Sequence, residues 1–146
     1  MTRAIDLAEA DLAECVDLFV ETFAGPPWDE TWAPDDALLR LGDFLRTPRS
    51  RAVGIRDGRG GLVGFALGHL ERLGAEDHVL LQEMCVRPRA QRAGHGAALL
   101  SGLADRMPDV THWHLLTARE ASSSTPEVVY VRLWNLTFPV GRVVIS

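Results

Sequence analysis

The 146-residue sequence contains no lysine, because all 15 of its basic residues are arginines. This absence excludes chemistry that depends on a lysine amine: Walker-type phosphate loops, Schiff-base and pyridoxal-phosphate enzymes, and Ser-Lys hydrolases. Asparagine occurs once and isoleucine three times. Since the scarce residues have AT-rich codons, we infer a GC-rich coding sequence and expect a bacterial source.

Cysteine is scarce as well, and long apolar runs are absent. Cys15 and Cys85 are too few for a disulfide framework, and we expect both to be small core residues. No apolar run approaches a membrane span of about 18 residues, and the acidic N-terminal segment is unlike a signal peptide. We therefore expect a cytoplasmic protein without a membrane partner.

The charge balance narrows the class of partner. A net charge of -5 argues against nucleic acid, which selects for clustered positive charge. An acidic chain suits a cationic or amine-bearing partner better. The length of 146 residues, with 47% hydrophobic and 24% charged residues, predicts one globular domain over residues 1–146.

Hydrophobic periodicity predicts an α/β fold with an antiparallel meander and a later crossover. The expected elements are a strand over 2–7, helices over 12–23 and 34–48, strands over 51–56, 62–72 and 78–86, a helix over 94–107, and a strand over 112–118. Residues 125–127 favour a helix start, whereas residues 129–133 alternate like a strand, so both remain open. A short strand over 140–145 is expected at the end.

An arginine-rich loop follows the 78–86 strand, and Gly94 and Gly96 then open a helix. Helix N-termini offer free N–H groups and a positive dipole end, and glycines let an anion approach the backbone closely. Leu99 stands where the dinucleotide-binding fingerprint requires its third glycine. Three arginines add positive charge: Arg87, Arg89 and Arg92. The segment predicts a phosphate-binding loop, the alternative being a helix that only caps itself.

The pattern Glu83-x-x-Val86-x-Pro88-x-x-Gln91-Arg92-x-Gly94-x-Gly96-x-x-Leu99-Leu100 resembles the acetyl-CoA-binding signature of the GNAT superfamily of N-acetyltransferases. Residues 23–32 also resemble a Pro-Trp-Asn-Glu-x-Trp segment of some bacterial members. The resemblance covers roughly residues 3–120. It implies the GNAT fold, a mixed central sheet with an antiparallel N-terminal meander, flanked by helices, whose central strands splay apart.

The resemblance further implies acetyl-CoA as co-substrate. The pyrophosphate would lie on backbone N–H groups of Gln91, Arg92, Ala93, Gly94, His95, Gly96 and Ala97. The pantetheine arm would pair with the backbone of Met84, Cys85 and Val86. The thioester carbonyl would be polarised near the Cys85 N–H, as oxyanion stabilisation by preplaced donors requires.

Direct acetyl transfer to a primary amine, in a ternary complex, needs a base for the amine and an acid for the leaving thiolate. Glu83 is the candidate base, since a carboxylate amid apolar strand residues has a raised pKa. The alternative is a carboxylate satisfied by a neighbouring arginine or a strand bulge. The resemblance suggests Tyr130 as the acid, although the family's usual motif around it is missing. Ala121 stands where a CoA-contacting asparagine is common.

The acceptor, a small-molecule or peptide amine, would lie between the first two helices and the splayed strands. Trp28, Asp29, Glu30 and Trp32 are candidates for its wall, because aromatic rings with carboxylates suit a cationic amine. Tryptophans that cap the core are the equal alternative. His112 and His114 lack a third ligand in the linear pattern, so no metal is expected.

Three readings therefore stand. The leading one is an acetyl-CoA-dependent N-acetyltransferase. The second is a non-catalytic acyl-CoA-binding or regulatory domain, favoured by the departures around Ala121 and Tyr130. The third is a nucleotide-binding module that uses the same loop. A homodimer stays open, as does completion by a partner of a tail that is short for the family.

Overall fold

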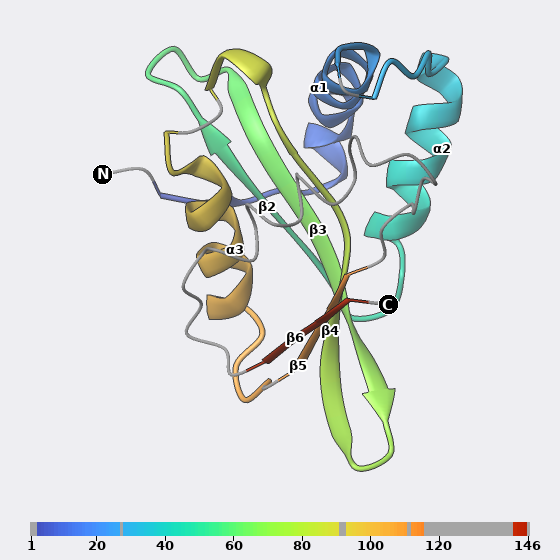
Figure 1. Ribbon diagram of the computed structural model, residues 1–146, viewed down its shortest axis with the longest axis vertical. Helices are drawn as coiled ribbons and strands as arrows, with labels where there is room; N and C mark the ends of the chain where they lie inside the picture. The colour runs from blue at the N-terminus through green and yellow to red at the C-terminus, as the bar shows by residue number, and fades with distance from the viewer. Residues whose placement is uncertain (1–2, 27, 91–92, 111, 116–141, 146) are drawn as a thin grey trace.

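A computed structural model describes residues 3–26, 28–90, 93–110, 112–115 and 142–145, with Leu115 and 142–145 described by backbone alone. In this part of the chain, six strands form one sheet in the order β1-β2-β3-β4-β5-β6 (Figure 1). The strands are β1 Ile5–Asp6, β2 Ser50–Arg56, β3 Leu62–Leu73, β4 Glu76–Val86, β5 His112–Leu115 and β6 Arg142–Ile145. Strands β1 to β4 are antiparallel, and β4, β5 and β6 are parallel. The predicted mixed sheet with an antiparallel N-terminal meander is confirmed.

The helices lie on both faces of this sheet. They are α1 Leu12–Ala24, α2 Pro34–Leu45 and α3 His95–Asp105, with short 3-10 turns over Glu9–Asp11 and Pro88–Ala90. Pro34 occupies the first turn of α2 together with two acidic residues, a favourable start for a helix. Helices α1 and α2 cover one face and α3 covers the other (Figure 1).

Each face of the sheet has its own hydrophobic core. On the α3 face, Leu99, Leu100 and Leu103 pack against Val79, Leu81 and Trp113, all fully or nearly fully buried. On the opposite face the core comprises Leu12, Cys15, Val16, Leu18, Phe19, Leu41, Phe65, Leu67 and Cys85. Both cysteines are therefore buried and free, as expected from their apolar surroundings.

A bulge in β4 decides which face its polar residue meets. Leu67 pairs with Glu83, but the next residue of β3 pairs with Leu81, so Gln82 is the extra residue. Because side chains alternate along a strand, one extra residue reverses the faces that follow it. Leu81 accordingly packs under α3, whereas Glu83 and Cys85 point toward α1 and α2.

Strand β5 pairs with only part of β4. The recorded pairs are Val79 with Trp113, Leu80 with His114, and Leu81 with Leu115. Within the described residues, β5 pairs with β4 as far as Leu81, and the splaying of the central strands stays a prediction. The predicted strand over 112–118 is described only to Leu115.

The short strand expected over 140–145 is present as β6. It pairs in parallel with β5 along its four residues. The open question of helix or strand over 125–138 lies outside the described residues. Nowhere in the part of the chain that the structure describes is a helix both long and apolar enough to span a bilayer.

Candidate acetyl-transfer site

Glu83 is a polar residue of β4, two residues beyond Leu81, the last β4 residue with a described partner on β5. Its side chain is 11% exposed, and its Oε2 lies 3.3 Å from Nε of Arg40 on α2. The Arg40 guanidinium also lies over two aromatic rings, 5.7 Å from the centroid of Trp32 and 4.8 Å from that of Phe44. The bulge and the arginine partner, which the sequence offered as alternatives to a catalytic role, are both present.

The surroundings of Glu83 favour its neutral form. Burial raises the pKa of Glu83 from its ordinary value of 4.5 to about 7, and the charge of Glu30 acts in the same direction. The positive charge of Arg40 and its hydrogen bond oppose this effect without cancelling it. A carboxylate with a pKa near neutrality can both accept and release a proton at physiological pH.

The Trp28–Trp32 segment lies against α1, and Trp32 also contacts Arg40. Trp32 packs edge-on against Phe19 at 5.1 Å between ring centroids, and its Nε1 donates a 3.1 Å hydrogen bond to Glu30. Trp28 packs against Phe23 at 5.3 Å. Both tryptophans are half-buried, so they cap the α1 core while leaving one side to solvent.

Asp29 has a conformational role in this segment. It is exposed and has a φ of 47°, which lies in the left-handed region. Its N–H donates to the carbonyl of Gly25, and the N–H of Glu30 donates to the carbonyl of Phe23. The turn thereby directs Glu30 and Trp32 toward Arg40.

Met84 and Cys85 follow on β4 beyond Leu81, the last residue with a described partner on β5. Cys85 itself is buried, with its Sγ 3.8 Å from the carbonyl oxygen of Leu18. Burial raises the pKa of this thiol far above its ordinary value. Cys85 can therefore contribute backbone groups to a site on β4, but its side chain is part of the core. Val86, the third residue predicted to bind pantetheine, is half-buried and packs against the α3-face core.

The predicted phosphate loop ends at the N-terminus of α3. Gly94 caps the helix with a φ of 82°, and a Cβ placed on it would meet nothing within 4 Å. The following residues, His95, Gly96 and Ala97, form the first helical turn, whose N–H groups have no partner earlier in the helix. Nδ1 of His95 is buried and has no hydrogen-bond partner among the described residues. An open backbone and an unsatisfied polar atom fit an anionic, hydrogen-bonding ligand.

The loop arginines do not all serve this helix end. Arg87 forms an ion pair with Glu21 on α1 and donates a 3.1 Å hydrogen bond to the carbonyl of Leu62. It therefore ties β4 to α1 and to the start of β3, and its contribution of positive charge to a phosphate-binding loop stays a prediction. Arg89 and Ala93 are exposed. Gln91, Arg92, Ala121 and Tyr130 lie outside the described residues.

Sequence reasoning missed Arg40 and a second cluster of polar side chains. Arg40 is 43 residues from Glu83 in the chain, and no local pattern marks it as a partner. The other cluster joins His112 to Glu76 and His78, which come from β4. In the sequence, the only signal for Arg40 or for this cluster was an ionisable residue within a largely apolar helix or strand.

The sequence over residues 12–124 matches the model of the family described as Acetyltransferase (GNAT) family. This match covers well over half of the chain. A comparison with curated proteins finds none that matches the sequence.

Several solved structures share the fold. A possible acetyltransferase from Clostridium difficile 630 has a TM-score of 0.68 at 12% identity, covering 94% of this chain and 91% of that one. The aminoglycoside antibiotic 6'-N-acetyltransferase AAC(6')-Ih from Acinetobacter baumannii has a TM-score of 0.67 at 12% identity, covering 100% and 96%. AAC(6')-Iy in complex with the bisubstrate analog CoA-S-monomethyl-acetylneamine has a TM-score of 0.64 at 18% identity, covering 100% and 96%. At such identities the likeness concerns the fold.

Proposed function

Because this chain belongs to the GNAT family of acetyltransferases, we propose that it is an N-acetyltransferase that moves the acetyl group of acetyl-CoA to a primary amine of a small molecule or peptide. One observation carries the proposal beyond the family: Glu83 on β4 is a buried carboxylate whose pKa is raised to about 7, on the face that α2 covers. In this proposal β4 and β5 separate beyond Leu81, and the linear thioester lies against that edge of β4 while an amine approaches from the α1 and α2 side.

The transfer proceeds directly within a ternary complex. An oxygen of Glu83 accepts a proton from the acceptor ammonium, and the neutral nitrogen attacks the thioester carbonyl carbon. The C–N bond forms and the C–S bond breaks. The nitrogen then gives up its second proton, which restores the proton that the acid donates to the CoA thiolate, and Glu83 releases its own proton to solvent. Backbone N–H groups of β4 near Cys85 stabilise the oxyanion, and Tyr130 supplies the thiolate proton in this proposal.

Acetyl-CoA would be held by main-chain groups at two places. The pantetheine amides would pair with Met84 and Cys85 as an added strand does. The pyrophosphate would lie at the N-terminus of α3, where the left-handed Gly94 keeps side chains away from the first-turn N–H groups. The unsatisfied Nδ1 of His95 supports a polar ligand there.

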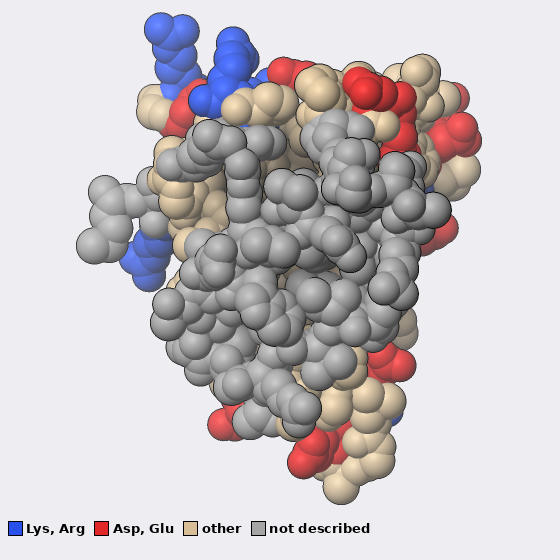
Figure 2. Space-filling view, viewed as in Figure 1, with Lys and Arg blue, Asp and Glu red and all other residues tan. Residues whose placement is uncertain are grey.

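The acceptor side is acidic, which favours a cationic amine. Figure 2 shows acidic side chains along the edge where α1 and α2 lie. The exposed acids of these helices are Glu14, Asp17, Glu21, Asp35, Asp36 and Asp43, and Arg40 is the single basic residue in either. Two structural neighbours are described as aminoglycoside 6'-N-acetyltransferases or bind an acetylneamine analog, so aminoglycosides belong in the first acceptor panel.

The absence of lysine makes this acceptor external. The chain has no lysine side chain to acetylate, so the only amine of its own is the N-terminus. Any acetylation that the purified protein carries out on added amines is thus free of background from its own side chains.

The Arg40–Glu83 contact supports one competing function, a non-catalytic acyl-CoA-binding domain. An arginine 3.3 Å from the carboxylate occupies the position an acceptor amine needs. Arg40 is 41% exposed, however, and its other contacts among the described residues include the stacking on Trp32 and Phe44. In an enzyme the cationic acceptor displaces this arginine from the carboxylate.

The deciding experiment follows free CoA thiol with acetyl-CoA and a panel of aminoglycosides, polyamines, amino acids and peptides. We expect turnover with at least one amine, and a fall of about 100-fold or more in kcat for Glu83→Gln, as general-base catalysis predicts. Glu71→Gln, which removes an exposed carboxylate on β3, is the control and should retain activity. CoA binding without turnover across the panel, unaffected by Glu83→Gln, would establish the non-catalytic reading, and thermal protection by ATP or NAD but not by CoA would establish a nucleotide-binding module.

A further inference from the structure

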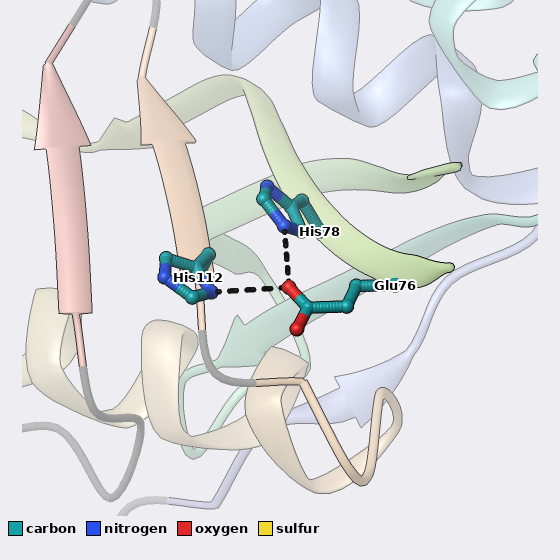
Figure 3. A group of neighbouring side chains, drawn as sticks. All are labelled: Glu76, His78 and His112. Carbon is teal, nitrogen blue, oxygen red and sulfur yellow. Dashed lines mark hydrogen bonds and ion pairs between the residues drawn. The ribbon is translucent and has the colours of Figure 1, made fainter. Parts of the chain in front are cut away.

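A cluster of histidines and a carboxylate lies where β4 and β5 begin to pair. Glu76 and His78 come from β4, and His112 and His114 come from β5. Figure 3 shows a Glu76 carboxylate oxygen facing one nitrogen of His78 and one of His112. No step of the proposed acetyl transfer uses these residues.

We propose that Glu76, His78 and His112 form a binding site for a divalent transition-metal ion of the zinc type, which fastens β4 to β5. Their ligand atoms all lie within 4.8 Å of one another. Two imidazole nitrogens with one carboxylate oxygen are a donor set that suits zinc and its neighbours in the first transition row. The inference is independent of the proposed transferase activity.

The distances are close to those of a metal shell. With zinc–nitrogen and zinc–oxygen distances of about 2.0–2.2 Å, neighbouring ligand atoms of a tetrahedral site lie about 3.3–3.5 Å apart. Oε2 of Glu76 lies 3.4 Å from Nε2 of His78 and 4.0 Å from Nδ1 of His112. Glu76 is 66% exposed, so its side chain has room to rotate and close the longer gap.

The hydrogen bonding of His78 orients it as a ligand. Its Nδ1 lies 2.8 Å from Nε2 of His114, and the His78 and His114 rings are stacked at 5.1 Å. When Nδ1 carries the proton and donates it to His114, the lone pair of Nε2 faces the Glu76 oxygen. Two acceptors so placed need a cation between them. Metal-bound histidines characteristically use their second nitrogen in this way.

The surroundings stabilise the two rings. The ring of His78 stacks on that of His112 at 4.7 Å between centroids, and Trp113, next to His112, is 1% exposed in the α3-face core. The backbones of β4 and β5 are thus held in fixed register by buried neighbours, while the ligand atoms remain at the surface. A metal would reinforce a strand contact that has only three recorded residue pairs.

The test is titration of the tag-free, EDTA-treated protein with zinc chloride, followed by calorimetry and thermal melting. We expect 1:1 binding with a Kd of about 10 µM or tighter, and a rise in Tm because the ion binds the folded chain. His112→Ala and Glu76→Gln should weaken binding by more than about 100-fold, exceeding the 10–100-fold effect of losing a supporting residue. Cobalt(II) in place of zinc should give the absorption bands of a tetrahedral N/O site.

Two controls keep the outcome unambiguous. His69→Ala removes a histidine that pairs with Gln82 on the neighbouring β3–β4 contact at 3.2 Å, outside the cluster, and should leave zinc affinity unchanged. Glu76→Gln preserves side-chain size at an exposed position, so it tests the site without unfolding the strand. Absence of saturable 1:1 binding, or equal affinity in wild type and His112→Ala, overturns the proposal and leaves a network in which Nε2 of His78 simply donates to Glu76.

Discussion

Replacing Glu83 by glutamine should change how the stability of the protein depends on pH. Glutamine keeps the size and hydrogen-bonding capacity of the side chain but cannot ionise. The prediction concerns only the folded chain, so it can be tested before any acceptor amine is known. Arg40, 3.3 Å away, remains in place in this variant.

The direction in which stability changes with pH follows from the pKa of Glu83 in the unfolded and in the folded chain. In the unfolded chain the pKa of Glu83 is close to 4.5, and burial raises it to about 7 in the folded chain. Below pH 4.5 both states bind the proton, so the burial of Glu83 does not lower the free energy of unfolding. Between pH 4.5 and 7 only the folded state holds it, and the wild type therefore loses stability as pH rises. Above pH 7 the whole cost is present.

The size of this change in unfolding free energy follows from the same difference in pKa. A change of about 2.5 pH units at about 1.36 kcal/mol per unit corresponds to roughly 3 kcal/mol of unfolding free energy. The 11% exposure of the Glu83 side chain is too small for water to screen most of this effect. For a chain of this size, 3 kcal/mol would lower Tm by roughly 6–12 °C.

The assay is urea unfolding of wild type and Glu83→Gln at several pH values from 5 to 8.5. We expect the variant to gain roughly 2.5 kcal/mol relative to wild type between the two ends of this range, since part of the cost is already present at pH 5. The control Glu71→Gln should follow the wild-type curve in shape, because its side chain is exposed. Parallel curves for wild type and Glu83→Gln would refute the assignment of a buried, proton-holding carboxylate.

Replacing Arg40 tests the same prediction in a second way. Its charge and hydrogen bond lower the pKa of Glu83, so Arg40→Ala should move the stability decline to higher pH. If Glu83 is the base, kcat/KM rises with pH through about 7 in wild type, because only the ionised carboxylate accepts a proton. The pH at which kcat/KM rises should be higher in Arg40→Ala than in wild type. An unchanged pH dependence would show that another group titrates.

Three further predictions follow from packing and loop geometry. Gly96→Leu should weaken CoA binding by more than about 10-fold in calorimetry, since the side chain obstructs the first turn of α3, and unchanged affinity would sink the loop assignment. Gly102→Ala should destabilise the protein by about 1–3 kcal/mol, because its Cβ would collide with the Cβ of Ala4. Gly42→Ala is also mid-helix but faces a flexible guanidinium, so it should be neutral or stabilising, and equal effects in thermal melts would contradict this. Cys15 and Cys85 should resist thiol reagents in the native state and react only after unfolding, because burial raises both thiol pKa values, that of Cys15 to about 12; rapid native labelling would show the core to be open.

The order of elements was predictable because it depends on local patterns. Apolar residues at helical spacing marked α1, alternation marked β2 to β4, and Pro34 marked the start of α2. The glycine pattern of the α3 N-terminus was readable for the same reason, since a left-handed cap such as Gly94 is a property of the local backbone. These features, together with the family resemblance, came from residues that are neighbours in the chain.

The partners of the polar groups were decided only by the tertiary structure. Glu83 meets Arg40 because a single extra residue, Gln82, turns it to the face that α2 covers, and a bulge depends on pairing with β3. Arg87 was expected only to add positive charge to the loop, and the fold pairs it with Glu21 on α1. Contacts of this kind join residues far apart in the sequence, where charge and period carry no information about register or distance.

The histidines show the same division. From the sequence, His112 lacked enough neighbouring ligands for a metal, because a one-dimensional pattern counts only residues of its own strand. The parallel pairing of β5 with β4 sets it beside His78 and Glu76. What the sequence determined by itself was the α/β order, the lysine-free acidic character and the phosphate-loop motif. Tertiary packing alone decided which charges meet, because strand register and helix docking are properties of the whole core.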